Sequence, residues 1–304
     1  MRLVTRSDFD GLVCAVLLKY IGLIDEYKFA HPKDLQDGLV EVTENDVLTN
    51  VPYVKGCGIW FDHHSSEAER LGEIQFTGAS RIAPSCARVI WDYYGGHDKF
   101  PDTLDVMMEA VDRVDSGSLT ADEVLHPSGW ILLGMIMDPR TGLGRYRDYR
   151  ISNYQLMLDL IDYCAEKPVD EILALPDVQE RTERYFDQQK RFEEMLLRCT
   201  TAHKNVIVTD LRNEEEIFTG NRFTIYSLFP QSNVSVLVIW GLKKQNVVLT
   251  VGYSILNRTC TVDVGSLMLK YGGGGHRKVG TCQVPTEKAE AVLAEVISAL
   301  KGKS

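Results

Sequence analysis

The chain has 304 residues, of which 44% are hydrophobic and 25% are charged, and its formal net charge is -10. This balance is typical of a folded globular protein, and the length favours two domains of ordinary size. The acidic charge argues against binding to long duplex nucleic acid or to an anionic membrane, since both require a basic surface. A small anionic substrate could still bind through a local basic pocket or a metal ion.

The cysteines and the N-terminus point to a reducing compartment. The seven cysteines are scattered, and no pair has the CxxC spacing of a zinc ribbon. The first residues lack the apolar segment of a secretory signal, and no apolar run reaches the roughly 20 residues that span a bilayer. We therefore expect a cytoplasmic protein without membrane contact.

The first half of the chain reads as repeated strand and helix units. A strand at residues 3–5 runs into an acidic loop and a helix over 12–20, and further strands are predicted at 46–50 and 58–61. Helices follow from about residue 84 and over 103–114. This alternation predicts an α/β fold with a parallel sheet.

The second half of the chain is first helical and then β-rich in its sequence pattern. Residues 151–199 have a helical pattern, and the charge run 180–184 reads as a solvated face or a connector. Segments 205–208, 234–240 and 246–251 are β-rich, and a glycine run at 272–275 precedes a C-terminal helix over 286–300. We therefore predict domains at 1–180 and 201–304, joined by a helical linker over 181–200.

Polar residues follow the three predicted strands of the first domain. Asp8 and Asp10 follow the first strand, Asn50 ends the second, and the triplet Asp62-His63-His64 ends the third. The carboxyl ends of strands gather ligands in open α/β sheets, so these residues should converge. Gly11 permits a tight turn that aims both aspartates at one point. An equally simple role for Asp8 or Asp10 is to cap the following helix.

The Asp62-His63-His64 triplet combines hard and borderline metal ligands, which suits Mn²⁺ or a similar divalent ion. Adjacent histidines point in different directions, so we expect one to bind metal and the other to meet substrate or transfer a proton. A less specific alternative is a pair of surface or capping residues.

The glycine run provides a second candidate site. Backbone amides of Gly273, Gly274 and Gly275 could approach an anion closely, and His276, Arg277 and Lys278 add cationic donors. Upstream, Asn257 and Arg258 could join them. A flexible turn is the alternative reading. Arg81 and Ser85 could contact phosphate, although Ser85 is more simply a helix cap.

Four motifs in order resemble those of the DHH phosphoesterase family. Residues 7–11 (SDFDG) and 61–64 (FDHH) resemble its first and third motifs, and residues 115–119 (DSGSL) resemble its fourth. Residues 272–276 (GGGGH) resemble the signature of the DHH-associated C-terminal domain. The resemblance covers nearly the whole chain. It implies an N-terminal domain that holds two divalent ions, usually Mn²⁺, and a smaller α/β substrate-binding domain.

The resemblance also implies roles for individual residues. Asp8, Asp10, His63 and Asp115 would bind metal, with Asp112 a competitor for the position of Asp115. Asp62 would orient the cluster as part of the metal and catalytic set, and His64 would contact phosphate or assist protonation. Substrate would meet His276, the preceding glycines and the Asn257-Arg258 pair. The implied chemistry is two-metal hydrolysis, in which water is activated between the cations and attacks phosphorus in line.

Two positions depart from the family pattern. No histidine precedes the first aspartate, because residues 4–7 are Val, Thr, Arg and Ser. The second motif, usually a bridging aspartate, is represented by Asn50, with Asp46 at the start of the same strand. The chain could therefore hold one ion or two, as Mn²⁺, Mg²⁺ or Co²⁺.

These observations predict a metal-dependent hydrolase of phosphoester or phosphoanhydride bonds. The candidate substrates are short oligonucleotides, pAp-like nucleotides, dinucleotides and polyphosphate. The alternative, prompted by Asn50, is a metal-depleted nucleotide-binding or regulatory protein without catalysis. A homodimer is compatible with the sequence.

Overall fold

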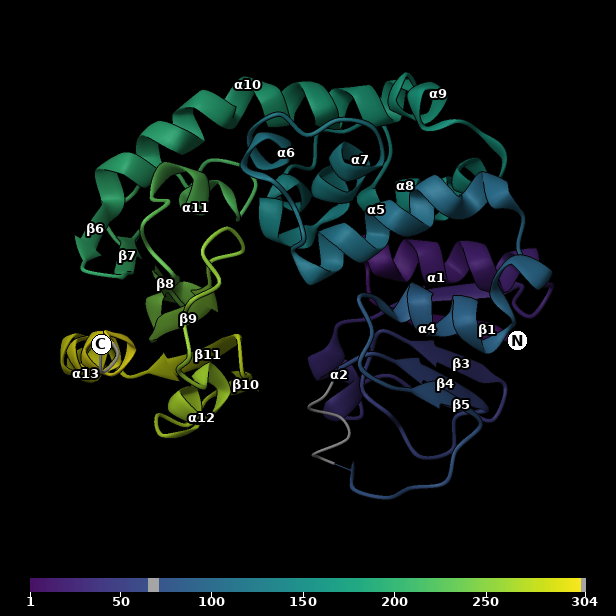
Figure 1. Ribbon diagram of the computed structural model, residues 1–304, viewed down its shortest axis with the longest axis horizontal. Helices are drawn as coiled ribbons and strands as arrows, with labels where there is room; N and C mark the ends of the chain where they lie inside the picture. Colours follow the sequence, from purple (N-terminus) through teal and green to yellow (C-terminus); the bar gives the residue numbers. More distant parts are fainter. Residues whose placement is uncertain (65–70, 302–304) are drawn as a thin grey trace. The chain divides into compact units, whose positions relative to one another are not determined.

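The computed structural model describes residues 1–64 and 71–301, which form two compact units (Figure 1). The first comprises Met1–Ser118 and His126–Phe186, and the second comprises Leu119–Leu125 and Asp187–Ser304. The long helix α10 (Pro176–Cys199) runs across the division. The observed units differ in two ways from the predicted ranges of 1–180, 181–200 and 201–304. Residues 119–125 group with the second unit, and the change of unit falls inside α10.

A five-stranded parallel sheet forms the centre of the first unit, as predicted. Its strand order is β2-β1-β3-β4-β5. Leu3, Val4, Leu48 and Trp60 are buried, which is expected of strands covered on both faces. The strands are β1 (Arg2–Thr5), β2 (Glu26–Phe29), β3 (Asp46–Thr49), β4 (Ile59–Asp62) and β5 (Gly78–Ser80).

Helix α1 (Phe9–Tyr20) is the central helix of the first unit. Residues 9–18 are all buried, because α1 packs against β1 and against the helices α4, α5, α7 and α8. This burial explains why the segment is apolar on every side. The other helices of the unit are α2 (Pro32–Gln36), α4 (Cys86–Tyr93), α5 (Asp105–Ser116), α7 (Gly129–Met137), α8 (Asn153–Glu166) and α9 (Val169–Leu173).

The second unit contains a six-stranded mixed sheet in the order β10-β11-β9-β8-β7-β6, in which only β7 and β8 are parallel. One face carries an apolar core that includes Val236, Leu249, Val264 and Val296. The elements are α6 (Ala121–Leu125), β6 (Thr200–His203), β7 (Val206–Asp210), α11 (Thr224–Leu228), β8 (Val234–Trp240), β9 (Val247–Tyr253), α12 (Val264–Leu269), β10 (Gly274–His276), β11 (Val279–Val284) and α13 (Ala289–Leu300).

The glycine run differs from the loop that the sequence predicts. Gly274–His276 form strand β10, which pairs antiparallel with β11, so the turn is confined to residues before Gly274. Within the described residues, every helix is too short or too polar to cross a bilayer.

Candidate metal centre

The register of the first sheet brings the predicted polar residues to one edge. Thr5 pairs with Thr49, and Thr49 pairs with Phe61, so β1, β3 and β4 end at the same level. The residues that follow these three positions therefore begin from neighbouring points at the carboxyl edge of the sheet. Gly11 helps to close the first loop, since a Cβ there would lie 1.9 Å from the Arg6 carbonyl oxygen.

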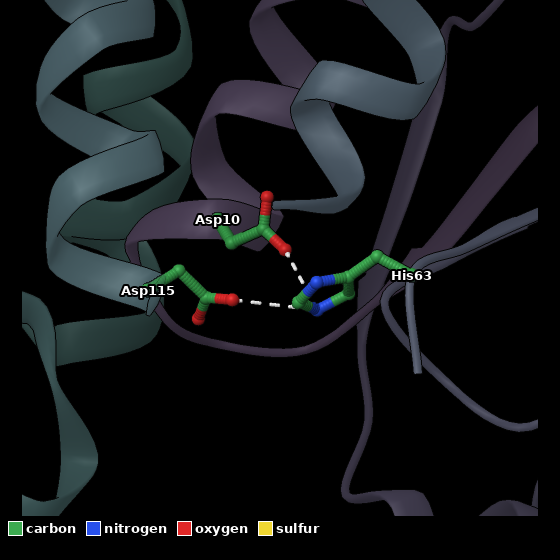
Figure 2. A group of neighbouring side chains, drawn as sticks. All are labelled: Asp10, His63 and Asp115. Carbon is green, nitrogen blue, oxygen red and sulfur yellow. Dashed lines mark ion pairs between the residues drawn. The ribbon is translucent and has the colours of Figure 1, made fainter. Parts of the chain in front are cut away.

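Three of the predicted ligands meet at this edge, and they come from three different elements (Figure 2). The Nε2 atom of His63 lies 3.3 Å from Asp115 Oδ2 and 3.7 Å from Asp10 Oδ2. One ligand atom from each residue lies within 4.8 Å of the other two. We call these residues the Asp10–His63–Asp115 cluster.

His63 presents a lone pair to two carboxylates. Its Nδ1 donates to the Ala83 carbonyl oxygen at 3.3 Å, which leaves Nε2 without a proton in the neutral ring. That Nε2 is buried and has no hydrogen-bond partner among the described residues. In the neutral ring this lone pair faces carboxylate oxygens, and a cation among the three groups would make all three contacts favourable.

Asp10 is fully enclosed by protein. It is 2% exposed, and its two oxygens accept hydrogen bonds of 2.9 Å from the backbone amides of Cys86 and Ala87 at the start of α4. Burial, and then the nearby Asp115 and Asp8 carboxylates, raise the pKa of Asp10 well above its usual value. Like charges in a buried space are costly without a compensating cation.

Asp115 rather than Asp112 faces the cluster. Asp115 lies in the last turn of α5, where helix carbonyl groups make a carboxylate unfavourable unless a cation is nearby. Asp112 instead accepts hydrogen bonds from Ser85 Oγ at 2.6 Å and Arg88 Nε at 2.8 Å. Ser85 caps α4 by accepting from the Arg88 backbone amide, which is the simpler of its two predicted roles.

Asp8 and Asn50 lie beside this cluster but bind each other. Asn50 Nδ2 donates to Asp8 Oδ1 at 3.0 Å, and Gly11 N donates to the same oxygen at 3.0 Å. Arg6 Nε lies 3.1 Å from Asp8 Oδ2. Asp8 is thus the N-cap of α1, the role that the sequence left open.

Asp62 orients His64. The buried Asp62 accepts from His64 Nδ1 at 2.8 Å and from the His64 backbone amide at 3.2 Å. Burial lowers the pKa of His64, but the hydrogen bond to Asp62 and the nearby Asp115 and Asp10 carboxylates outweigh it, so the net shift is upward. Asp62 therefore favours a protonated His64, and it is not one of the three residues of the Asp10–His63–Asp115 cluster.

The predicted substrate residues lie in the second unit. Gly273 and Gly275 pack against β11, because a Cβ at either would lie 2.1 or 2.3 Å from the Thr281 or Val279 carbonyl oxygen. Gly274 has open space at its Cβ position. Asn257 donates to Gln231 O in the segment between α11 and β8 and accepts from Thr259 Oγ1, and Arg258 Nε donates to Ile255 O.

Arg140 and Asp138 form a part of the site that the sequence analysis missed. Arg140 binds Asp138 through Nε at 2.7 Å and Nη2 at 2.8 Å, and both line a small cavity with Asp8, Asp10 and Asp115. The only signal in the sequence is an Asp-Pro-Arg triplet directly after an apolar helix, and it has no metal-ligand spacing.

The donor set fits a divalent cation. It combines two carboxylates with an imidazole whose second nitrogen is fixed by a backbone carbonyl, a frequent arrangement of outer contacts around metal ligands. The chemistry of the three residues therefore agrees with the family expectation of a metal site.

Comparison with known structures identifies the family of this fold. The chain is similar to PggH from Vibrio cholerae, a pGpG-specific phosphodiesterase, with 51% identity over 100% of this chain and 99% of that one, and a TM-score of 0.84. The chain belongs to the DHH phosphoesterase family and is a metal-dependent phosphoester hydrolase.

Two more distant structures share the fold. An exopolyphosphatase-related protein from Bacteroides fragilis is 14% identical, with a TM-score of 0.51, over 98% of this chain and 91% of that one. RecJ from Thermus thermophilus in complex with Mn²⁺ is 13% identical, with a TM-score of 0.56, over 100% of this chain and 52% of that one. No family model matches the chain, and no curated protein matches it.

Proposed function

We propose that the chain hydrolyses the phosphodiester bond of pGpG, with Mn²⁺ held by Asp10, His63 and Asp115. The substrate assignment is supported by the 51% identity, over the full length, to a pGpG-specific phosphodiesterase. The metal assignment is supported by the buried Nε2 of His63, which lies between two carboxylates without a hydrogen bond.

The ion accounts for the activation of water and phosphate. A divalent ion at this position would polarise a phosphoryl oxygen and lower the pKa of a water molecule. Asp10 and Asp115 would supply the negative charge that holds it, and the Ala83 carbonyl orients the His63 ring so that Nε2 could bind it. The backbone amides of Cys86 and Ala87 keep the Asp10 carboxylate from turning.

His64 is suited to protonate the leaving group. Its Nδ1 is held by Asp62, so its Nε2 is the ring atom directed away from that carboxylate. When water forms its bond to phosphorus and the ester P–O bond breaks, the departing ribose oxygen needs a proton, and a protonated His64 would donate it. Hydrolysis of pGpG would yield two molecules of GMP.

The second unit would bind the remainder of the dinucleotide. His276 lies on the edge strand β10, and the open Cβ position of Gly274 leaves backbone accessible beside it. Arg258 adds a cation near Asn257. We infer a cytoplasmic location, because all seven cysteines lack a disulfide partner, and homodimerisation stays a prediction.

A substrate panel tests the function. Protein stripped with EDTA is incubated with pGpG, cyclic di-GMP, pAp or polyphosphate, with and without Mn²⁺ or Mg²⁺, and products are separated by chromatography. We expect GMP from pGpG only with a divalent ion and at a higher kcat/KM than from the other compounds. Preferred cleavage of another compound would replace the substrate assignment, and tight pGpG binding without turnover would indicate a binding protein.

A further inference from the structure

Resting on this proposed function, we infer that the centre binds one divalent ion per chain, and that Arg6 and Asn50 neutralise Asp8 in place of a second ion. The family resemblance implies two ions, so this inference concerns how the present chain departs from it.

The contacts of Asp8 leave little room for a cation. An ionised carboxylate offers about four lone-pair positions. Gly11 N and Asn50 Nδ2 each donate to Oδ1 at 3.0 Å, and Arg6 Nε lies 3.1 Å from Oδ2. An ion bound by Asp8 would lie beside the Arg6 guanidinium at Oδ2 or meet two N–H groups at Oδ1, and both contacts are repulsive. Asp10 also accepts two backbone N–H groups, but no guanidinium or side-chain amide within residues 1–64 and 71–301 is bound to it, and its Oδ2 lies 3.7 Å from His63 Nε2.

The Asn50 amide is aimed in the direction that repels a cation. Turning the amide over would place its oxygen against Asp8 Oδ1, so the hydrogen bond fixes the NH₂ group on the side of Asp8. The backbone of Asn50 is also constrained, with φ at 55° and its amide donating to Phe61 O at 3.2 Å. Asn50 therefore supplies a donor between β1 and β3 rather than an oxygen ligand.

The charges around the cavity balance with one divalent ion. Four carboxylates, Asp8, Asp10, Asp115 and Asp138, are accompanied by two guanidinium groups, Arg6 and Arg140. With all six groups charged, their sum is about -2, which is the charge that one divalent ion neutralises.

The stoichiometry of bound Mn²⁺ tests this inference directly. The full chain is equilibrated with excess MnCl₂, passed through a desalting column and analysed for manganese and protein by mass spectrometry and amino-acid analysis. We expect about one Mn²⁺ per chain and the six-line electron paramagnetic resonance spectrum of an isolated ion. Two Mn²⁺ per chain, or the spectrum of a coupled pair, would overturn the inference.

A pair of variants locates the ion. Asp8→Asn keeps an oxygen that caps α1 and should keep one Mn²⁺ per chain with an affinity within about threefold of the unchanged chain. Asp115→Asn should weaken Mn²⁺ binding by at least about 100-fold. A folded Asp8→Asn variant that binds no Mn²⁺ would overturn the inference, and if this variant does not fold, the stoichiometry of the unchanged chain decides.

These results are separable from the test of function. Hydrolysis of pGpG by a chain that binds two Mn²⁺ would contradict the single ion and leave the proposed function intact. One bound ion in a chain that cleaves no phosphoester would support the single ion and contradict the proposed function.

Discussion

His63 and His64 are adjacent in the sequence, but their Nδ1 atoms bind different groups, a backbone carbonyl for His63 and a carboxylate for His64. His63 Nδ1 donates to a carbonyl oxygen, which directs Nε2 at the carboxylates of Asp10 and Asp115, whereas His64 Nδ1 is bound by the Asp62 carboxylate, which favours a protonated ring. The sequence analysis expected one histidine to bind metal and the other to act on substrate. The surroundings of the two rings support His63 for the first role and His64 for the second.

A matched pair of substitutions separates these roles. His63→Asn should abolish both Mn²⁺ binding and pGpG hydrolysis, whereas His64→Asn should retain Mn²⁺ and lower kcat by roughly 100- to 10,000-fold. Calorimetric titration with MnCl₂ and steady-state kinetics measure the two effects. Loss of Mn²⁺ binding in His64→Asn alone would show that the assignments are reversed.

The metal-free cluster should be electrostatically strained. Asp10 is buried beside Asp115 and Asp8, so an ion should stabilise the fold: at about 100 times its dissociation constant, it would contribute ~2.7 kcal/mol and raise Tm by ~5–10 °C. The Asp115→Asn variant should lose the rise in Tm that Mn²⁺ causes. In EDTA its Tm should be equal to or higher than that of the unchanged chain, because the substitution removes a negative charge beside Asp10. Thermal unfolding with EDTA or Mn²⁺ tests this, and an increment that persists in Asp115→Asn would contradict the site.

Within the elements, the glycine run has both a packing role and a proposed binding role. Gly273→Ala should destabilise the second unit, because its Cβ would lie 2.1 Å from the Thr281 carbonyl oxygen. Gly274→Ala should leave stability within roughly 0.5 kcal/mol, because its Cβ position is open. If the Gly274 backbone contacts substrate, this variant should nevertheless raise KM for pGpG several-fold. An unchanged KM would remove Gly274 from the binding site.

Asp46 joins β1 to β3 at the end of the sheet opposite the metal centre. It accepts from Arg2 Nε at 2.6 Å and from the Thr43 backbone amide at 2.7 Å. Burial alone would raise the pKa of Asp46, but these hydrogen bonds outweigh burial and lower it. Asp46 is therefore not a replacement for the missing second-motif aspartate.

The lowered pKa gives the stability contribution of Asp46 a defined pH dependence. The contribution is complete above the unfolded-state pKa near 3.9 and is lost as pH falls through the lower folded-state pKa. Asp46→Asn should cost roughly 1–3 kcal/mol at pH 7. In urea denaturation of metal-free protein, the difference in unfolding free energy between the unchanged chain and Asp46→Asn should be constant from about pH 7 to about pH 5. It should become smaller below about pH 4. A difference in unfolding free energy that grows as the pH falls would contradict a stabilising role for the ionised Asp46.

The buried strands and the acidic loop could be predicted, because apolar runs ending in Asp or His carry the signal. Strand β2 (Glu26–Phe29) was missed because it is a polar edge strand, and β5 (Gly78–Ser80) because it is short and has no apolar pattern. The hydrogen bond between Asn50 and Asp8, and the placement of Arg140, depend on side-chain packing between distant segments. Such contacts leave no periodic trace in the sequence.

For the whole molecule, the net charge of -10 and the local charges of the site have different consequences. The acidic total disfavours a long polyanion, and at the site Arg6 and Arg140 are paired with Asp8 and Asp138, so a bound divalent ion would supply the positive charge that a small phosphorylated molecule needs. A dinucleotide is short enough to depend on that local field. The chain is similar over its full length to a phosphodiesterase specific for such a substrate.

The most direct test of the account is anomalous diffraction from crystals grown with MnCl₂, recorded at the manganese absorption edge. We predict an anomalous peak among Asp10, His63 and Asp115, at about 2.0–2.3 Å from Nε2 of His63 and from one oxygen of each aspartate. A fully occupied manganese peak that contacts none of these three residues would contradict the central claim.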